Sequence, residues 1–247
     1  MEIDQDFIDR ALGTPDNEGQ GPQGSAAWLF ERVGYITASR FEDAIGKGKK
    51  GQYLAAREAY KWELVIERLT GSPSEHWTSA AMQWGSDCEQ RSRMAFEAAT
   101  GMILEPCGFI KHPQAKWIGC SPDALIGEDG GFESKSPYNS RYHLETLIAG
   151  MIPPEHFAQV QGGMWITGRA YWEFQSFDPR LPEPLNCFRQ RVERDQTYID
   201  KLAVEIDAFA DEVNDLTARL AKNLAASGNG VAGSAGRTTS PSAAGLP

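Results

Sequence analysis

Apolar residues recur along this chain at two spacings, which separate helical segments from extended ones. Residues 53–70 carry apolar side chains at the helical period, and Gly71 with Pro73 marks the end of that helix. Ser25 can cap a helix over 26–33. The same signals predict further helices over 1–12, from Thr37 or Ser39 through Phe41 and Ile45, and over 79–100, 139–150 and 155–167.

Alternating or clustered apolar residues predict the strands, which lie mainly in the middle of the chain. They fall at 102–111, 115–120, about 123–127, 132–136 and 170–177. The glycine-rich turn at 128–131 separates two of them. Helices followed by strands and then by helix, strand and helix indicate an α/β or α+β domain, with a central mixed sheet flanked by helices.

The C-terminal part of the domain is predicted to be one long helix over 186–224. From Ile199 to Leu220 apolar residues repeat at alternating steps of three and four. This stripe packs either on the domain's own sheet or against another subunit. Residues 225–247 are rich in Ala, Gly and Ser and are expected to be disordered.

Length and composition fit a single folded domain over 25–224, preceded by an N-terminal helix and loop over 1–24. Hydrophobic residues make up 41% of the chain, which is enough for a sizeable core. No run of about 18 apolar residues is present and the N-terminus lacks signal-peptide features, so we expect a cytoplasmic protein without membrane contact. The four cysteines show no metal-binding spacing and are expected to be reduced core thiols.

The net charge of −10 argues against a protein that coats nucleic acid with a basic face. An enzyme acting on nucleic acid remains compatible with this charge, because bound divalent metal ions supply positive charge locally. The glycine-flanked loop at 47–50 holds Lys49 and Lys50 and is a candidate DNA contact. A merely solvated loop explains it equally well.

Candidate chemistry concentrates where Ser121-Pro122-Asp123 precedes Glu133-Ser134-Lys135 across the predicted turn. Two adjacent strands joined by that turn bring Asp123 and Glu133 to one end of a sheet, and strand alternation puts Glu133 and Lys135 on one face. Paired carboxylates favour a hard cation between them, such as Mg²⁺ or Mn²⁺. The alternative is an Asp in a surface turn beside an exposed Glu–Lys pair.

Five short motifs follow one another in order. They are RVGYITAS at 32–39, WGSDCE at 84–89, SPD at 121–123, ESK at 133–135, and QVQ with MW at 159–165. In this order, from about residue 26 to 180, the chain resembles the phage lambda exonuclease and YqaJ-type viral recombinase family of PD-(D/E)XK nucleases. The resemblance implies a restriction-endonuclease-like core.

The resemblance also implies a metal centre with two divalent ions, Mg²⁺ or alternatively Mn²⁺. Asp123 and Glu133 would be ligands, together with the backbone carbonyl of Ser134 and the carboxylate of Glu89. Without the resemblance, Glu89 is as well explained by a helix-surface pair with Arg93.

The remaining implied roles concern the nucleophile and the DNA end. Lys135 would orient the attacking water, and Gln159 would steady the site. Arg32 and Ser39, with Ser121, would bind a 5′-terminal phosphate, since an arginine fork and a helix N-terminus both suit phosphate. The alternatives are a solvated arginine and a plain helix cap.

Two features depart from the family pattern. Ala124 stands where a glycine often follows the aspartate, and both neighbours of Lys135 are serines. The charged positions are nevertheless all present, so activity is still expected.

The expected function is a Mg²⁺-dependent exonuclease that degrades double-stranded DNA from 5′ ends to mononucleotides and leaves a 3′ single strand for phage-type recombination. The resemblance implies a homotrimeric ring around DNA and a single-strand annealing protein as partner, in a bacterial host. Alternatives are a sequence- or structure-specific endonuclease, a non-catalytic DNA-end binding module, and a small-molecule hydrolase, which would leave Arg32 and Ser39 without a role.

Overall fold

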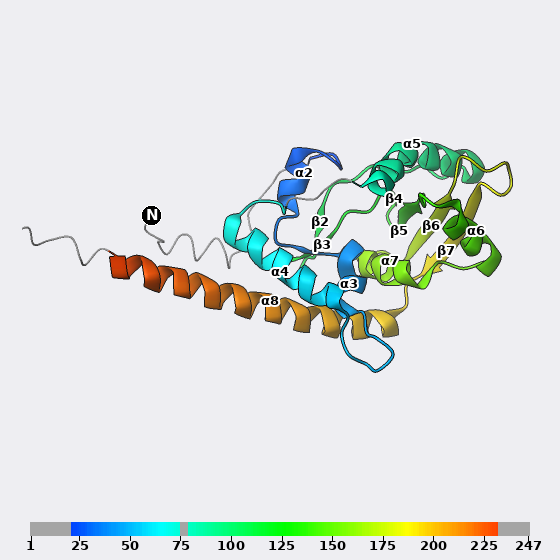
Figure 1. Cartoon of the computed structure of the whole chain (residues 1–247). Coiled ribbons are helices and arrows are strands. Elements are labelled where there is room, and N and C mark those ends of the chain that lie inside the picture. Colours follow the sequence, from blue (N-terminus) through cyan, green and yellow to red (C-terminus); the bar gives the residue numbers. More distant parts are fainter. Residues whose placement is uncertain (1–20, 75–78, 232–247) are drawn as a thin grey trace, which may run out of the picture.

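The computed structural model describes residues 21–74 and 79–231 (Figure 1). The predicted helix over 1–12 lies outside these residues. The described helices are α2 (Ala26–Glu31), α3 (Phe41–Ile45), α4 (Ala55–Thr70), α5 (Ala80–Thr100), α6 (Ser140–Ala149), α7 (Pro154–Thr167) and α8 (Gln196–Val231), with a 3₁₀ turn η1 (Ala38–Arg40). The strands are β1 (Ile36–Thr37), β2 (Ile110–Lys111), β3 (Ile118–Cys120), β4 (Ala124–Ile126), β5 (Gly130–Lys135), β6 (Tyr171–Phe177) and β7 (Cys187–Glu193).

The strands form two mixed sheets, which confirms the predicted mixed α/β class. The first has the order β1-β3-β2, with β1 parallel and β2 antiparallel to β3. The second has the order β4-β5-β6-β7, in which only the β5–β6 pair is parallel. The single central sheet of the prediction is thus divided, with the predicted Asp–Glu–Lys residues on the four-stranded part.

Helices cover both faces of the four-stranded sheet (Figure 1). On the α5 face, Phe96 packs on Phe132 of β5 with ring centroids 4.7 Å apart. On the α7 face, Met164 packs with Trp172 and Phe174 of β6. Because neighbouring strand residues alternate between faces, β5 can bury Phe132 under α5 while turning Glu133 to the opposite side.

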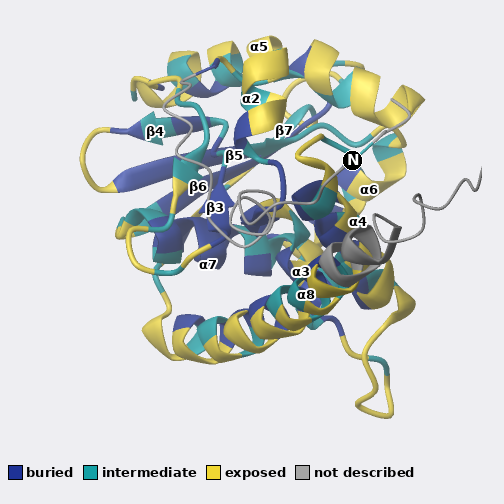
Figure 2. Ribbon diagram, turned by 90° about the vertical axis from the view of Figure 1, so that its left-hand side faces the viewer, coloured by how far each residue is buried: buried dark blue, intermediate teal, exposed yellow. Residues whose placement is uncertain are grey.

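The long C-terminal helix packs on its own domain. Ile206, Phe209 and Val213 are fully buried in a core shared with α3, α4, α7 and the three-stranded sheet. Figure 2 shows α8 with a buried inner face and an exposed outer face. The phenyl ring of Phe209 stacks on Tyr60 of α4 at 5.6 Å between centroids. The predicted stripe is therefore used within the domain rather than for a subunit contact.

Three predicted boundaries were wrong. Residues 186–224 are not one helix, because β7 completes the edge of the sheet before Asp195 caps α8 with its carboxylate. α8 also continues to Val231, beyond the predicted boundary at 224. The predicted strand over 102–111 is reduced to β2, and β1 was missed because its parallel partner β3 lies far away in sequence.

The predicted flexible basic loop is tied at its base. Lys47 and Tyr53 form an antiparallel bridge, and the Lys47 ammonium lies 2.6 Å from Glu205 of α8. Lys49 and Lys50 remain exposed at the tip. Within the described ranges, no helix combines the length and apolar character needed to cross a membrane.

We expect Phe209→Ala to lower the free energy of unfolding by about 3–5 kcal/mol, since it leaves a cavity where a fully buried ring packs. Val204→Ala on the same helix is the matched control, because Val204 is 70% exposed and its loss should change stability by less than about 0.5 kcal/mol. Urea denaturation measures both. Equal effects of the two substitutions would show that α8 is not docked on the domain.

Candidate active site

Asp123 and Glu133 meet because β4 and β5 form a hairpin. Ala124 pairs with Phe132 across the antiparallel ladder, which puts the preceding Asp123 opposite the following Glu133. The Ser134 backbone N–H donates a hydrogen bond to the Asp123 carboxylate at 2.7 Å. This bond fixes the aspartate, which directly precedes β4, against the C-terminal end of β5.

Lys135 lies on the same face of β5 as Glu133, as the alternation predicted. Its ammonium nitrogen is 2.7 Å from Oε1 of Glu133. Glu133 is only 4% exposed, whereas the Lys135 side chain is about a third exposed. The alternative of an exposed Glu–Lys surface pair is therefore wrong for Glu133.

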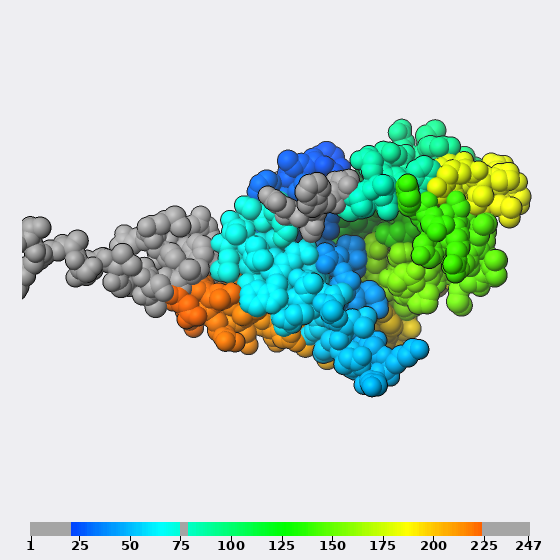
Figure 3. Space-filling model, viewed as in Figure 1, coloured from blue at the N-terminus to red at the C-terminus, as the bar shows by residue number. Residues whose placement is uncertain are grey.

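These residues line a cavity of about 280 Å³ that is open to solvent on one side. β5 contributes Glu133, Ser134 and Lys135, and α5 contributes Ala81, Gly85 and Glu89 to the opposite wall. Figure 3 shows the surface hollowed below α5 and beside the green segments of α6 and α7. Small residues on α5 leave room for a ligand at the carboxylates.

Glu89 belongs to this cavity and also pairs along its helix. Arg93 lies at i+4, with its Nη1 4.0 Å from Oε1 of Glu89. Glu89 therefore forms the helix-surface pair and also lines the cavity.

Like charges shift the proton affinities of the site. Burial and then Glu133 raise the pKa of Asp123 well above its usual value, against the opposing effects of Lys135 and the Ser134 N–H. Burial also raises the pKa of Glu89, with a further contribution from Glu133. For Lys135, burial lowers the pKa but Glu133 and Asp123 outweigh it, so the net shift is upward and the ammonium stays charged.

The donor set suits a hard divalent cation, although the three carboxylates do not converge on one point. Asp123 and Glu133 offer oxygen ligands in a cavity where their mutual repulsion is only partly relieved by Lys135. In 21–74 and 79–231 no group of three or more His, Cys, Asp or Glu side chains is arranged to hold a metal ion. Glu89 lines the cavity as a more distant acidic group.

A series of buried hydrogen bonds that the sequence did not reveal supports β5 from the α5 side. Gln175 of β6 donates to the backbone carbonyl and the hydroxyl of Ser92, at 2.7 and 2.6 Å. The Ser92 hydroxyl in turn contacts that of Ser134. Both Gln175 and Ser92 are fully buried, so these hydrogen bonds fix the distance between α5 and β5.

Two of the three residues predicted to bind a 5′ phosphate, Arg32 and Ser121, contact Trp28. Its indole N–H donates to the hydroxyl of Ser121 at 3.0 Å, and the Arg32 guanidinium lies 4.2 Å from the centre of its ring. Ser121 directly precedes the Pro122-Asp123 segment, so Arg32 is linked to the carboxylate site through one side chain.

Ser39 is not a helix N-cap, contrary to the prediction. It lies inside η1, and Arg40 occupies the position before α3. Its exposed hydroxyl is 3.3 Å from that of Thr37. The 3₁₀ turn begins directly after β1, and neither Thr37 nor Ser39 caps a backbone N–H there.

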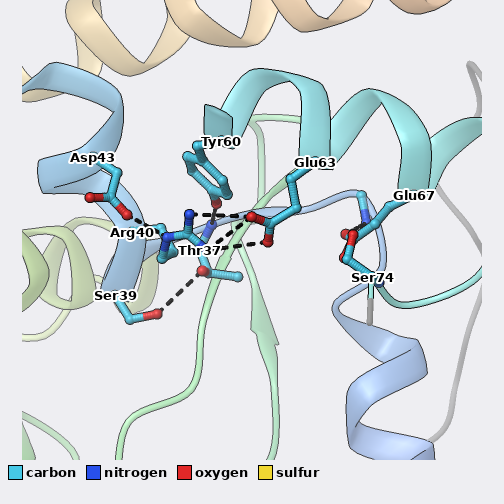
Figure 4. Close-up of polar contacts among 9 residues, drawn as sticks. Thr37, Ser39, Arg40, Asp43, Tyr60, Glu63, Glu67 and Ser74 are labelled. Carbon is cyan, nitrogen blue, oxygen red and sulfur yellow. Dashed lines mark hydrogen bonds and ion pairs between the residues drawn. The ribbon is translucent and has the colours of Figure 1, made fainter. Parts of the chain in front are cut away.

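A cation beside Ser39 was missed in the sequence. Arg40 lies over the ring of Tyr60 at 4.2 Å and pairs with Glu63 at 3.2 Å and with Asp43 (Figure 4). The Tyr60 hydroxyl accepts the Thr37 backbone N–H at 3.0 Å. Nearby Glu63 and Glu67 oppose the burial that lowers the pKa of Arg32. The Ser39 region thus carries both cations and counter-charges.

Three other predicted residues do not line the cavity. Gln159 is half-buried on α7, outside the residues that form its wall, and Lys49 and Lys50 lie at the tip of the tied loop. His156, one turn before Gln159, is instead close to Lys135. Burial, and then the positive charge of Lys135, lowers the pKa of His156 to about 4. A lone histidine in a helix gave no sequence signal.

The four cysteines are free, with Cys88 and Cys120 buried and Cys107 and Cys187 partly so. Burial raises the pKa of the Cys107 thiol to about 11. These observations agree with the predicted reduced thiols.

We expect Asp123→Asn to raise the Tm at pH 7 in the presence of EDTA. The folded state raises the pKa of Asp123, so the ionised carboxylate costs stability once the pH exceeds the unfolded pKa of about 3.9. The gain should disappear at lower pH, where the wild-type carboxyl is protonated in both states. Thermal unfolding measures it, with exposed Asp129→Asn as control. A gain that is independent of pH would contradict the charge argument.

Comparison with known proteins places this geometry in a family. Residues 27–170 match the YqaJ-like viral recombinase domain. The chain is 36% identical to LHK-Exo, an alkaline exonuclease from Laribacter hongkongensis, with a TM-score of 0.75 over 81% of this chain and 98% of that one. A second LHK-Exo structure, with dAMP, matches equally well.

A phage-related exonuclease from Haemophilus somnus 129PT shares the fold at 14% identity, with a TM-score of 0.60 over 75% of this chain and 96% of that one. No curated protein sequence matches significantly. The domain match covers more than half of the 247 residues. The chain belongs to the YqaJ-like viral recombinase domain family.

Proposed function

We propose that this chain is a metal-dependent exonuclease that degrades double-stranded DNA from 5′ ends to mononucleotides, leaving a 3′ single strand for phage-type recombination. The observation that carries the proposal is the placement of Asp123, Glu133 and Lys135 around one cavity. The similarity of the chain to LHK-Exo, an alkaline exonuclease, supports an exonuclease activity. The dAMP bound to LHK-Exo is a mononucleotide, the class of product proposed here.

Asp123 and Glu133 would hold Mg²⁺, or Mn²⁺, with the Ser134 carbonyl and with Glu89 on the far wall of the cavity. Two such ions would lower the pKa of a bound water and neutralise the leaving oxygen. Glu133 is paired with Lys135 at 2.7 Å. Engaging Glu133 with a cation would therefore release the Lys135 ammonium to donate to the attacking water or to a phosphate oxygen.

Arg32, Ser39 and Ser121 would bind the 5′ phosphate and set the register of cleavage. The Trp28 ring fixes the direction of the Arg32 guanidinium and holds Ser121 by a hydrogen bond. An arginine fork matches two phosphate oxygens. Gln159 would support the site indirectly, and Lys49 and Lys50 would meet the duplex.

We also propose how copies of the chain assemble and where the enzyme acts. Three copies would form a ring around DNA, a single-strand annealing protein would load on the exposed 3′ strand, and the enzyme would work in the cytoplasm of a bacterial host. A ring retains DNA topologically, which is compatible with a net charge of −10.

We expect Asp123→Ala to reduce release of mononucleotides at least about a hundredfold, because it removes a metal ligand and the partner of the Ser134 N–H. The assay uses a linear duplex labelled at its 3′ end, with Mg²⁺ or EDTA, beside a closed circle. Asp129→Ala is the control and should retain activity. Cleavage of the circle would favour an endonuclease, and binding without cleavage an end-binding module.

We expect Arg32→Ala to slow digestion of a 5′-phosphorylated end by about tenfold to a hundredfold, the loss of a charged hydrogen-bonding pair. Digestion of a 5′-hydroxyl end should change little. Rates on the two ends are compared, with Arg219→Ala on the exposed face of α8 as control. Equal slowing on both ends would remove Arg32 from the phosphate site.

A further inference from the structure

A second cavity of about 260 Å³ adjoins the active-site cavity, and Lys135 lines both. It opens on the side of the sheet covered by α6 and α7. Phe174 and Ser176 of β6 contribute to its wall, directly beside Glu133 and Lys135 of β5 in the parallel ladder. A ligand in one cavity is therefore next to a ligand in the other.

The wall of this second cavity is suited to a flat, largely apolar group. The imidazole of His156 stacks near-parallel on the ring of Phe174, with centroids 5.8 Å apart and planes at 29°. Tyr142, Met151 and Pro153 complete the apolar surface. The pKa of His156, about 4, keeps the imidazole neutral at physiological pH, so the wall adds no charge where a ring would lie.

The polar side chains of the cavity include two carboxylates. Glu145 and Glu155 line it together with the hydroxyl-bearing Thr146 and Ser176. Carboxylates repel a phosphate but accept hydrogen bonds from exocyclic amines and ring N–H groups of nucleobases. Lys135 is the one lining residue with a positive charge, and it also faces the two carboxylates of the active site.

We propose that this cavity receives the base of the nucleotide whose phosphate lies at Asp123 and Glu133. The inference rests on the proposed nuclease function. Lys135 marks the boundary, with phosphate on one side and base on the other. Stacking on aromatic and apolar walls tolerates any base, which an enzyme that digests every sequence requires, and unbranched Met151 can adapt to rings of different size.

The test pairs a pocket variant with substrates that lack a base. The variant is Tyr142→Ala with Met151→Ala. Its residues are 60% and 56% exposed, so the fold should be unaffected. Ile148→Ala on α6, the helix that carries Tyr142, is the control, because Ile148 is 86% exposed and lies outside the cavity wall. The substrates are duplexes with an abasic residue at each of the first three positions from the 5′ end.

At one of these positions, wild type should lose about tenfold in kcat/KM when the base is missing, the scale of one stacked base. The double variant should lose a similar factor on ordinary DNA and almost nothing further on the abasic substrate. The control should behave as wild type. Equal sensitivity of wild type and double variant to every abasic position would overturn the proposal.

A binding measurement separates this outcome from failure of the nuclease proposal. Calorimetry with Mg²⁺ compares dAMP with 2-deoxyribose 5-phosphate, which lacks the base. Wild type should bind dAMP about tenfold more tightly, and the double variant should bind both alike. This comparison needs no cleavage, so an inactive protein still decides it: equal affinity of wild type for both ligands would overturn the base site.

Discussion

The structure depends on gathering negative charge at the open end of the β4–β5 hairpin. Asp123 and Glu133 face each other across the hairpin, and burial makes their repulsion costly, as the raised pKa of Asp123 shows. Two interactions hold them there: the Ser134 N–H on Asp123 and the Lys135 ammonium on Glu133. Neither fully offsets the repulsion, so the site favours whatever brings further positive charge.

The rest of the domain keeps this charged end of the hairpin from relaxing. β5 is bound by β4 on one side and by β6 on the other. The chain from Gln175 through Ser92 to Ser134 ties it to α5. A strand fixed on three sides cannot turn Glu133 to solvent without breaking buried hydrogen bonds, each of which is costly to leave unmade. Preorganisation of the carboxylates is therefore a consequence of the surrounding polar network.

Local geometry decided which parts could be predicted from the sequence. Asp123, Glu133 and Lys135 lie on one short hairpin, so turn residues and strand alternation were enough to bring them together. The packed stripe of α8 was predictable for the same reason. The strand β7 was missed because its residues, CFRQRVE, pair with β6 only through tertiary contacts. Arg40 meets Glu63 across 23 positions and His156 meets Lys135 across 21, and no periodic pattern reports such pairs.

Several surface cations of this acidic chain are held in ion pairs with its own carboxylates. Arg40 is paired with Glu63 and Asp43, Lys47 with Glu205, and Arg57 with Glu212. Each of these cations meets a carboxylate of its own chain, so a DNA phosphate gains little by displacing it. Arg32 differs, since its guanidinium lies on an aromatic ring with carboxylates only in its wider surroundings. An anion that reaches Arg32 would therefore meet a cation without breaking an ion pair.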